Sequence, residues 1–310
     1  RRERWSGGED RRERGPGGED RRVEDMNRVA VIGAGTMGNG IAHVFAQAGW
    51  QTLLIDVSPE SLKKGKATIE KNAERQVSKG TLTEEQRHQL LGRITTSSKL
   101  EHIEGFGDIE LAVEAATENP EIKFDIFENL DRLCPPATVL ASNTSSISIT
   151  EIAKQTRRPG KVIGMHFMNP VPLMPLVEVV KGLETGDGCV ARIVEITQSL
   201  GKTPVVVNDA PGFGSNRVLV PLINEAILCV QEGVATAEAV DQVMTLGMKH
   251  PLGPLALADL IGLDVCLAIL DVMVEGFGDP KYRPARLLKE MVAQGRLGRK
   301  SGHGFYVYGN

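Results

Sequence analysis

His166 and Glu178 could form an acid–base pair. His166 follows the largely apolar run 161–165, and Glu178 is the only charged residue in the run 176–180. An imidazole titrates near neutral pH, so it can take a hydroxyl proton as hydride leaves the same carbon. A carboxylate on the other ring nitrogen would fix the tautomer and stabilise the imidazolium, and burying that carboxylate is costly unless it is paired. A core histidine and a structural ion pair are the alternative interpretations.

A second candidate site is the glycine-rich stretch Gly33-Ala34-Gly35-Thr36-Met37-Gly38, which has the spacing G-x-G-x-x-G. An apolar run, 29–32, precedes it, a helical pattern follows it, and the next apolar run, 52–55, ends in Asp56. A glycine-rich turn of some other α/β protein is the alternative. The strand before the turn, the helix after it and the acid at the right distance favour a dinucleotide site.

Each part of this stretch has a physical role in binding a dinucleotide. Gly33 allows the turn out of the strand, Gly35 lets the backbone approach a pyrophosphate, and Gly38 lets the helix pack closely on the strand. Unpaired N–H groups at the start of the helix would face the phosphates. Asp56 can bind both ribose hydroxyls and would repel a 2′-phosphate, so we expect the cofactor to be NAD rather than NADP.

The elements that must position these residues alternate between strand-like apolar runs and helical patterns up to about residue 207. This alternation predicts a Rossmann-type α/β domain over 27–207, with a doubly wound, mostly parallel sheet. Ligands of such sheets bind beyond the carboxyl ends of the strands. Ser145 and His166 each follow a predicted strand, so we expect both to lie just past strand ends and to face the cofactor cleft.

From about residue 208 the pattern becomes helical, which predicts an all-α C-terminal domain over 208–310. Its third expected helix is apolar around most of its circumference, which indicates burial on several sides. In a domain of this size, such a helix favours a subunit interface as well as a local core. The helices are expected near 213–232, 236–246, 254–275 and 283–294.

Residues 1–26 differ from the rest of the chain. RRERWSGGED and RRERGPGGED form a near-perfect ten-residue repeat that is charged and glycine-rich. Such a segment cannot bury a core, so we expect it to be a disordered extension. Met26 lies just before the first expected strand, and we interpret the segment as a dispensable extension upstream of the natural start. An arginine-rich tail for an acidic partner is the alternative, and the interleaved acids weigh against it.

Composition narrows the class of function. A chain of 310 residues suits about two domains, and a formal net charge of −4 with 4% aromatic residues disfavours nucleic-acid binding. The four cysteines include no C-x-x-C pair, which is typical of buried thiols in a reducing compartment. We therefore expect a cytoplasmic protein without a metal site. No run is long and apolar enough to span a bilayer, so we expect no membrane partner.

Lys71, Arg75 and Lys79 share one face of a predicted helix, 58–79. Acidic residues lie nearby, so a solvated face is the default interpretation of this basic edge. A phosphate-binding edge near the active cleft is the alternative.

Four motifs together resemble the 3-hydroxyacyl-CoA dehydrogenase family in its short, single-function form, which includes 3-hydroxybutyryl-CoA dehydrogenases. The motifs are the turn 33–38, Ser142-Asn143-Thr144-Ser145-Ser146, His166-Phe167-Met168-Asn169-Pro170, and Pro211-Gly212-Phe213 through Asn216-Arg217. The resemblance runs from about residue 27 to residue 308. It implies an NAD-binding Rossmann domain, a helical dimerisation domain, and reversible oxidation of an (S)-3-hydroxyacyl-CoA to a 3-oxoacyl-CoA.

The resemblance also implies roles for individual residues. His166 matches the family's catalytic base and Glu178 its carboxylate partner. Ser145 and Asn216 match the residues that hold the 3-oxygen of the substrate, and Asn169 matches a further active-site amide. Because Asn216 lies in the helical domain, we expect a cleft between the domains. Asn72 and Lys79 fall where the family binds the CoA end, which favours the phosphate-binding interpretation of the basic edge.

The cofactor contacts implied by the resemblance extend beyond the glycine-rich turn. They comprise residues of the turn itself, the acid after the second strand, and polar residues further along the chain. The residues are Gly33, Gly35, Thr36, Met37, Gly38, Asp56, Glu118, Lys123, Ser145, Asn169 and Lys300.

Several residues depart from the family pattern. Met168 replaces a second Phe, Pro175 replaces a Lys or Arg, and Gly214-Ser215 replace larger apolar residues before Asn216. His303 lies in the terminal G-x-G-F-Y. These departures leave open the acyl-chain preference and the packing around Asn216. Two other functions also stay open: a related dehydrogenase of a free hydroxy or sugar acid, as in the lambda-crystallin-like branch, and a non-catalytic NAD-binding protein.

Overall fold

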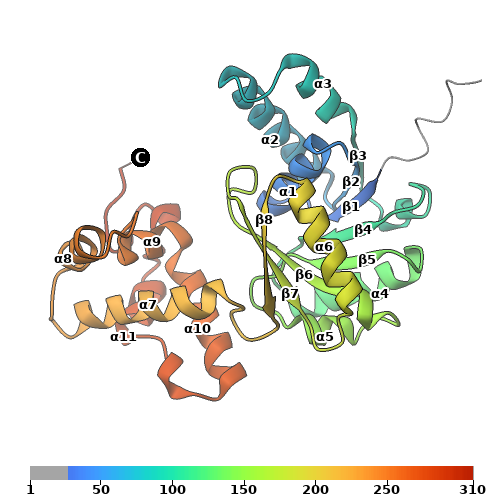
Figure 1. The fold of residues 1–310 in the computed structure, drawn as a ribbon. Coiled ribbons are helices and arrows are strands. Elements are labelled where there is room, and N and C mark those ends of the chain that lie inside the picture. Colours follow the sequence, from blue (N-terminus) through green and yellow to red (C-terminus); the bar gives the residue numbers. More distant parts are fainter. Residues whose placement is uncertain (1–26, 310) are drawn as a thin grey trace, which may run out of the picture.

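The computed structural model describes residues 27–309. The charged repeat 1–26 lies outside this range, so its predicted disorder stays a prediction. The described chain forms a sheet domain and a helical domain that lies beside it (Figure 1). The sheet ends at Asn208, and the first helix of the helical domain begins at Ser215.

The sheet has eight strands in the order β3-β2-β1-β4-β5-β6-β7-β8. All neighbouring pairs are parallel except β6 and β7, which are antiparallel, so the mostly parallel sheet is confirmed. The strand order reverses between β1 and β4, which is where ligands of doubly wound sheets bind. The strands are β1 Arg28–Ile32, β2 Gln51–Ile55, β3 Ile94–Ser97, β4 Leu111–Glu114, β5 Val139–Ser142, β6 Val162–Phe167, β7 Leu176–Lys181 and β8 Thr203–Asn208.

Helices cover both faces of the sheet, because alternate residues of each strand point to opposite sides. Val29 and Val31 of β1 belong to one apolar cluster, which α1 and α6 cover, and Ala30 belongs to another, which α4 and α5 cover. The helices of this domain are α1 Thr36–Gln47, α2 Pro59–Ser78, α3 Glu84–Gly92, α4 Pro120–Leu133, α5 Ile149–Ala153 and α6 Asp187–Ser199.

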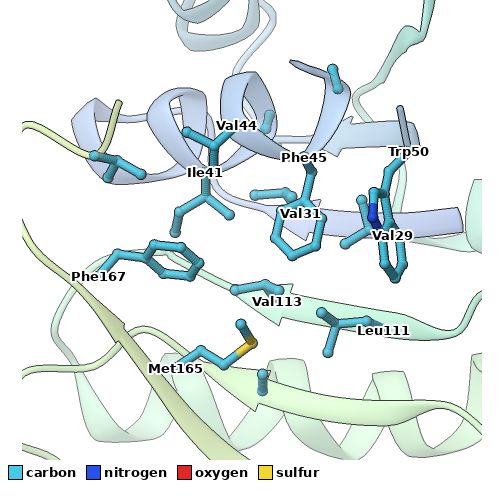
Figure 2. Packing of buried hydrophobic residues seen from close by; sticks show 14 of the residues in the cluster. Val29, Val31, Ile41, Val44, Phe45, Trp50, Leu111, Val113, Met165 and Phe167 are labelled. Carbon is cyan, nitrogen blue, oxygen red and sulfur yellow. The ribbon is translucent and has the colours of Figure 1, made fainter. Parts of the chain in front are cut away.

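Helix α1 anchors the glycine-rich turn to the sheet. Its side chains Ile41 and Phe45 lie over β1 and β4 (Figure 2). Phe45 is fully buried and packs edge-on against Trp50, with the ring centroids 5.3 Å apart. Burial of these large apolar groups fixes the start of α1 relative to the carboxyl end of β1.

The helical domain surrounds its own apolar cluster. One expectation about this domain is wrong, since the helix predicted over 254–275 is two helices. Gly262 separates them with a φ of 107°, a conformation that ends a right-handed helix and that L side chains rarely adopt. The helices are α7 Ser215–Gln231, α8 Ala237–Gln242, α9 Pro254–Ile261, α10 Leu263–Phe277 and α11 Arg286–Ala293, and a short π-helix, Val243–Gly247, extends α8. Within 27–309, no helix is both long and apolar enough to cross a membrane.

Candidate active site

The glycine-rich turn has the close packing that its sequence predicts. Gly33 has a φ of 104°, and a Cβ there would lie 2.5 Å from the Ala115 carbonyl oxygen. A Cβ on Gly38 would overlap the Gly33 carbonyl oxygen. A Cβ on Gly35, by contrast, would meet no atom within 4 Å. The fold of the turn therefore requires glycine at positions 33 and 38. The space beside Gly35 is open, and this is where the backbone of such a turn approaches a pyrophosphate.

Asp56 lies directly after β2 and is held by two backbone donors. Its Oδ2 accepts a hydrogen bond from the Ala34 amide at 2.8 Å, and its Oδ1 accepts one from the Ser58 amide at 2.9 Å. A cavity of about 660 Å³ lies beside it, lined by residues of the turn, by Ile55 at the end of β2, and by residues 115–117 after β4. This size and lining fit the adenosine half of NAD at the carboxyl edge of the sheet.

His166 and Glu178 form the predicted pair across the antiparallel junction of β6 and β7. They lie directly opposite each other in β6 and β7, and His166 Nδ1 is 2.7 Å from Glu178 Oε2. The residues are 8% and 3% exposed. The expectation that His166 lies past the end of its strand is wrong: it lies inside β6, because the pairing with β7 extends the strand to Phe167.

Glu178 receives further donors from the start of the helical domain. Its Oε2 accepts from the Ser215 hydroxyl at 2.7 Å, and its Oε1 accepts from the amides of Ser215 at 2.7 Å and Gly214 at 3.2 Å. Burial alone would raise the pKa of Glu178, but the hydrogen bonds from His166 and Ser215 lower it below its usual value. Glu178 is therefore an anion at neutral pH, and it can stabilise an imidazolium.

Ser145 lies in the loop after β5, past the strand end as expected. Glu118 holds this loop, because its Oε1 accepts from the amide of Ser145 at 2.9 Å and from the hydroxyl of Ser145 at 3.2 Å. The hydroxyls of Thr144 and Ser146 donate to the same oxygen at 2.6 and 2.9 Å. Burial by itself would raise the pKa of Glu118, but the Lys123 ammonium and the donors of this loop lower it.

Lys123 is almost completely buried, with 1% exposure. Its ammonium lies 2.6 Å from Glu114 Oε1 and 3.5 Å from Glu118 Oε2. Ser142 donates to the other Glu114 oxygen at 2.6 Å. In this structure Lys123 thus joins a buried network behind the Ser145 loop, and its predicted contact with the cofactor stays a prediction.

Asn216 and Ser145 lie together although they come from different domains. The Asn216 side-chain amide donates to the Ser145 carbonyl oxygen at 3.3 Å. Asn169 lies in the exposed loop after β6. A third asparagine, Asn143, accepts from the Phe167 amide at 2.9 Å and so connects the end of β6 to the loop that carries Ser145.

Three predicted contact residues lie apart from this cluster. Asn72 is in α2, and Lys79 caps the C-terminal end of that helix, where its side chain is exposed. Lys300 lies in the helical domain, where it forms an ion pair with Asp264 at 2.5 Å. The roles of these residues in binding stay predictions.

Ser215, Glu114 and Asn143 are site residues that have no predicted role in the sequence. Glu114 carries a signal of the same kind as Glu178, since it is a lone acid at the end of a buried apolar run and must be paired. The sequence marks Ser215 only as a residue that differs from the family pattern, and it does not indicate a contact with Glu178. Asn143 lies within a recognised motif, but its partner is a backbone amide that no side-chain pattern reveals.

Two models of one protein family match this chain. The model of the 3-hydroxyacyl-CoA dehydrogenase NAD-binding domain matches residues 28–210, and the model of the C-terminal domain of the same family matches residues 212–308.

No group of metal-binding side chains is found in the described range.

Several similar proteins are named 3-hydroxybutyryl-CoA dehydrogenase. A probable 3-hydroxybutyryl-CoA dehydrogenase of Bacillus subtilis is 52% identical over 92% of this chain and 98% of its own length. A 3-hydroxybutyryl-CoA dehydrogenase of Bradyrhizobium diazoefficiens is 50% identical over 91% of this chain and 96% of its own length. The crystal structure of an (S)-3-hydroxybutyryl-CoA dehydrogenase from Ralstonia eutropha is 46% identical and superposes with a TM-score of 0.89, covering 92% of this chain and all of that one. The chain therefore belongs to the 3-hydroxyacyl-CoA dehydrogenase family, with an NAD-binding Rossmann domain followed by the helical domain of that family.

Proposed function

We propose that this protein catalyses the reversible NAD-dependent oxidation of (S)-3-hydroxyacyl-CoA to 3-oxoacyl-CoA, with short chains such as 3-hydroxybutyryl-CoA as substrates. The observation that carries the proposal is the buried His166–Glu178 pair beside the loop of Ser145. The relatives named 3-hydroxybutyryl-CoA dehydrogenase, which match this chain over nearly their whole length, support the short-chain substrate.

His166 is the proton acceptor for oxidation. Its Nδ1–H donates to Glu178 at 2.7 Å, so Nε2 carries the free lone pair. As that nitrogen takes the substrate's hydroxyl proton, the anionic Glu178 stabilises the imidazolium that results. In the reverse direction the imidazolium returns the proton. NAD bound at the glycine-rich turn would supply the hydride acceptor.

Ser145 and Asn216 hold the 3-oxygen of the substrate in this proposal. Their proximity, through the hydrogen bond of 3.3 Å from the Asn216 amide to the Ser145 carbonyl, supports a shared binding point. The Ser145 hydroxyl donates to Glu118 at 3.2 Å in this structure, and to hold the 3-oxygen it would turn that proton toward the substrate, because the substrate's own hydroxyl proton goes to His166. Asn169, Asn72 and Lys79 would bind the rest of the substrate, with the last two at the CoA end.

The assembly and the cellular setting belong to the same proposal. Exposed apolar side chains on the helical domain, among them Val218 of α7 and Leu260 of α9, support a homodimer through that domain. The four cysteines have free thiols, which supports a reducing compartment such as the cytoplasm. The reaction belongs chemically to fatty acid metabolism.

The test compares oxidants of NADH. Acetoacetyl-CoA should drive NADH oxidation with a kcat/KM at least about a hundredfold above that of free acetoacetate, because only the thioester carries the CoA group. A series of 3-oxoacyl-CoA substrates from C4 to C16 then gives the chain preference, which we expect to be highest at C4. Equal rates with free acetoacetate would favour a dehydrogenase of free hydroxy acids instead.

A further inference from the structure

Ser215 is the first residue of α7, yet its side chain does not cap its own helix. The hydroxyl donates to Glu178 Oε2, the same oxygen that faces His166 Nδ1, and both distances are 2.7 Å. We propose that Ser215 is a positioning residue for the His166–Glu178 pair, and that through it the helical domain sets the orientation and the proton affinity of the base. This inference rests on the proposed dehydrogenase activity.

The carboxylate of Glu178 is held at both of its oxygens. Oε1 accepts from the Gly214 and Ser215 amides, while Oε2 is shared between Ser215 and His166. Three of these four hydrogen bonds come from residues 214–215. The strand neighbours of Glu178, Val177 and Val179, are fully buried and apolar, so they offer no side-chain replacement. The direction in which Glu178 holds the imidazole thus depends on the first residues of α7.

Gly214 makes this contact possible. A Cβ on Gly214 would lie 2.8 Å from Glu178 Oε1, closer than real Cβ atoms approach other atoms. Gly214 therefore lets the backbone come near the carboxylate, and Ser215 supplies the hydroxyl. At both positions the family pattern has larger apolar residues. The structure explains both departures by the same contact, since each residue lies against the Glu178 carboxylate.

The electrostatic effect of Ser215 has a definite sign. Its hydroxyl partly neutralises Oε2, the atom that stabilises the imidazolium. Without that hydroxyl, Oε2 would attract the imidazolium more strongly, and protonation of His166 would begin at higher pH. Val205 of β8 lies beside Glu178 in register, and among the described residues His166 is the one ionisable group bonded to its carboxylate.

The domain connection gives Ser215 a second role. Glu178 and His166 belong to the sheet domain, whereas Ser215 begins the first helix of the helical domain. Asn216, the next residue, reaches the Ser145 loop. Consecutive residues of α7 thus contact the carboxylate partner of the base and the loop of the proposed 3-oxygen site, so a displacement of α7 would alter both.

The experiment compares Ser215→Ala with Ser215→Thr and with a matched control, Ser148→Ala. Ser148 also donates its hydroxyl to a carboxylate at 2.7 Å, that of Asp209, and it lies outside the pair. We expect Ser215→Ala to lower kcat about tenfold while KM changes less than about twofold, since ground-state binding is untouched. The acidic limb of the kcat/KM profile for 3-hydroxybutyryl-CoA oxidation should move to higher pH. Ser215→Thr should restore both, and Ser148→Ala should keep both.

Each outcome decides the matter. Wild-type protein without acetoacetyl-CoA-dependent NADH oxidation would refute the proposed function. Active wild-type protein with an unchanged kcat and pH profile in Ser215→Ala would refute the role of Ser215 alone. Equal losses in Ser215→Ala, Ser215→Thr and Ser148→Ala without a shift of the acidic limb would show a structural role only. If Ser215→Ala does not fold, Gly214→Ala disturbs the hold of residues 214–215 on the same carboxylate at Oε1, and an unchanged kcat in that variant would also overturn the inference.

Discussion

Replacing Glu178 with Gln is the most informative perturbation of the pair, because it keeps the shape of the side chain and removes its charge. The Gly214 and Ser215 amides both donate to Oε1, so the new amide oxygen must take that position. The NH₂ group then takes the place of Oε2, facing His166 Nδ1. His166 can pair with it only by accepting, which moves the imidazole proton to Nε2.

This tautomer cannot accept the substrate proton at Nε2. The same exchange of a carboxylate for a carboxamide in a Ser-His-Asp triad lowers kcat about 10⁴-fold. We expect Glu178→Gln to lower kcat for oxidation by about 10³- to 10⁴-fold, which corresponds to about 4 to 5.5 kcal/mol of lost transition-state stabilisation. NADH affinity should change less than about twofold, because the cofactor site lies on other strands.

The assay is steady-state oxidation of 3-hydroxybutyryl-CoA, with NADH binding followed by fluorescence. Glu151→Gln is the matched control, since Glu151 is an exposed acid whose partner is Lys154, and it should keep the wild-type kcat. A Glu178→Gln variant that retains more than about a tenth of the wild-type kcat would refute the role of Glu178 in setting the tautomer.

Three further predictions concern the cofactor site and the fold. Asp56→Ala should lower kcat/KM for NAD about tenfold or more, because two hydrogen bonds to the ribose are lost, and it should reduce the preference for NAD over NADP. An unchanged ratio of the two kcat/KM values in steady-state kinetics would contradict this prediction. Phe45→Ala should cost about 3 to 5 kcal/mol in the free energy of unfolding measured by urea denaturation, and a loss below about 1 kcal/mol would contradict the packing of α1. Burial would raise the pKa of Asp131, but the guanidinium groups of Arg157 and Arg158 hold it below its usual value. A lowered pKa in the folded state stabilises the protein above the unfolded-state pKa of about 4, and the stabilisation is lost as the pH falls through the folded-state pKa. Asp131→Asn should therefore destabilise the protein at pH 7 and much less at pH 3, and equal loss at both pH values would contradict the assignment.

Much of the cofactor site was predictable because it is local in sequence. The turn, the helix after it and Asp56 lie within one short segment. A Cβ on Gly38 would meet Gly33 in the same segment, whereas a Cβ on Gly33 would meet Ala115, just after β4. The pairing of His166 with Glu178 was also predictable, since a lone acid in a buried apolar run needs a partner.

The remaining parts of the site depend on contacts that the sequence does not encode locally. Nothing in the run 176–180 distinguishes an antiparallel from a parallel strand, so the position of His166 inside β6 was missed. Ser215 reaches Glu178 across 37 residues of chain. The break between α9 and α10 at Gly262 was not predicted, because the apolar pattern continues across it and the positive φ of Gly262 does not change the spacing of apolar residues. Lys123 resembles a surface lysine in sequence, and only the tertiary structure buries it against Glu114.

The central claim is that His166 is the proton acceptor and donor of an NAD-dependent 3-hydroxyacyl-CoA dehydrogenase. The most direct test measures acetoacetyl-CoA-dependent oxidation of NADH by the wild-type protein and by His166→Gln, with NADH affinity measured on both. We expect turnover by the wild-type protein, a loss of at least about 10³-fold in the variant and NADH affinities within about twofold of each other. Near-normal turnover in His166→Gln would contradict the account.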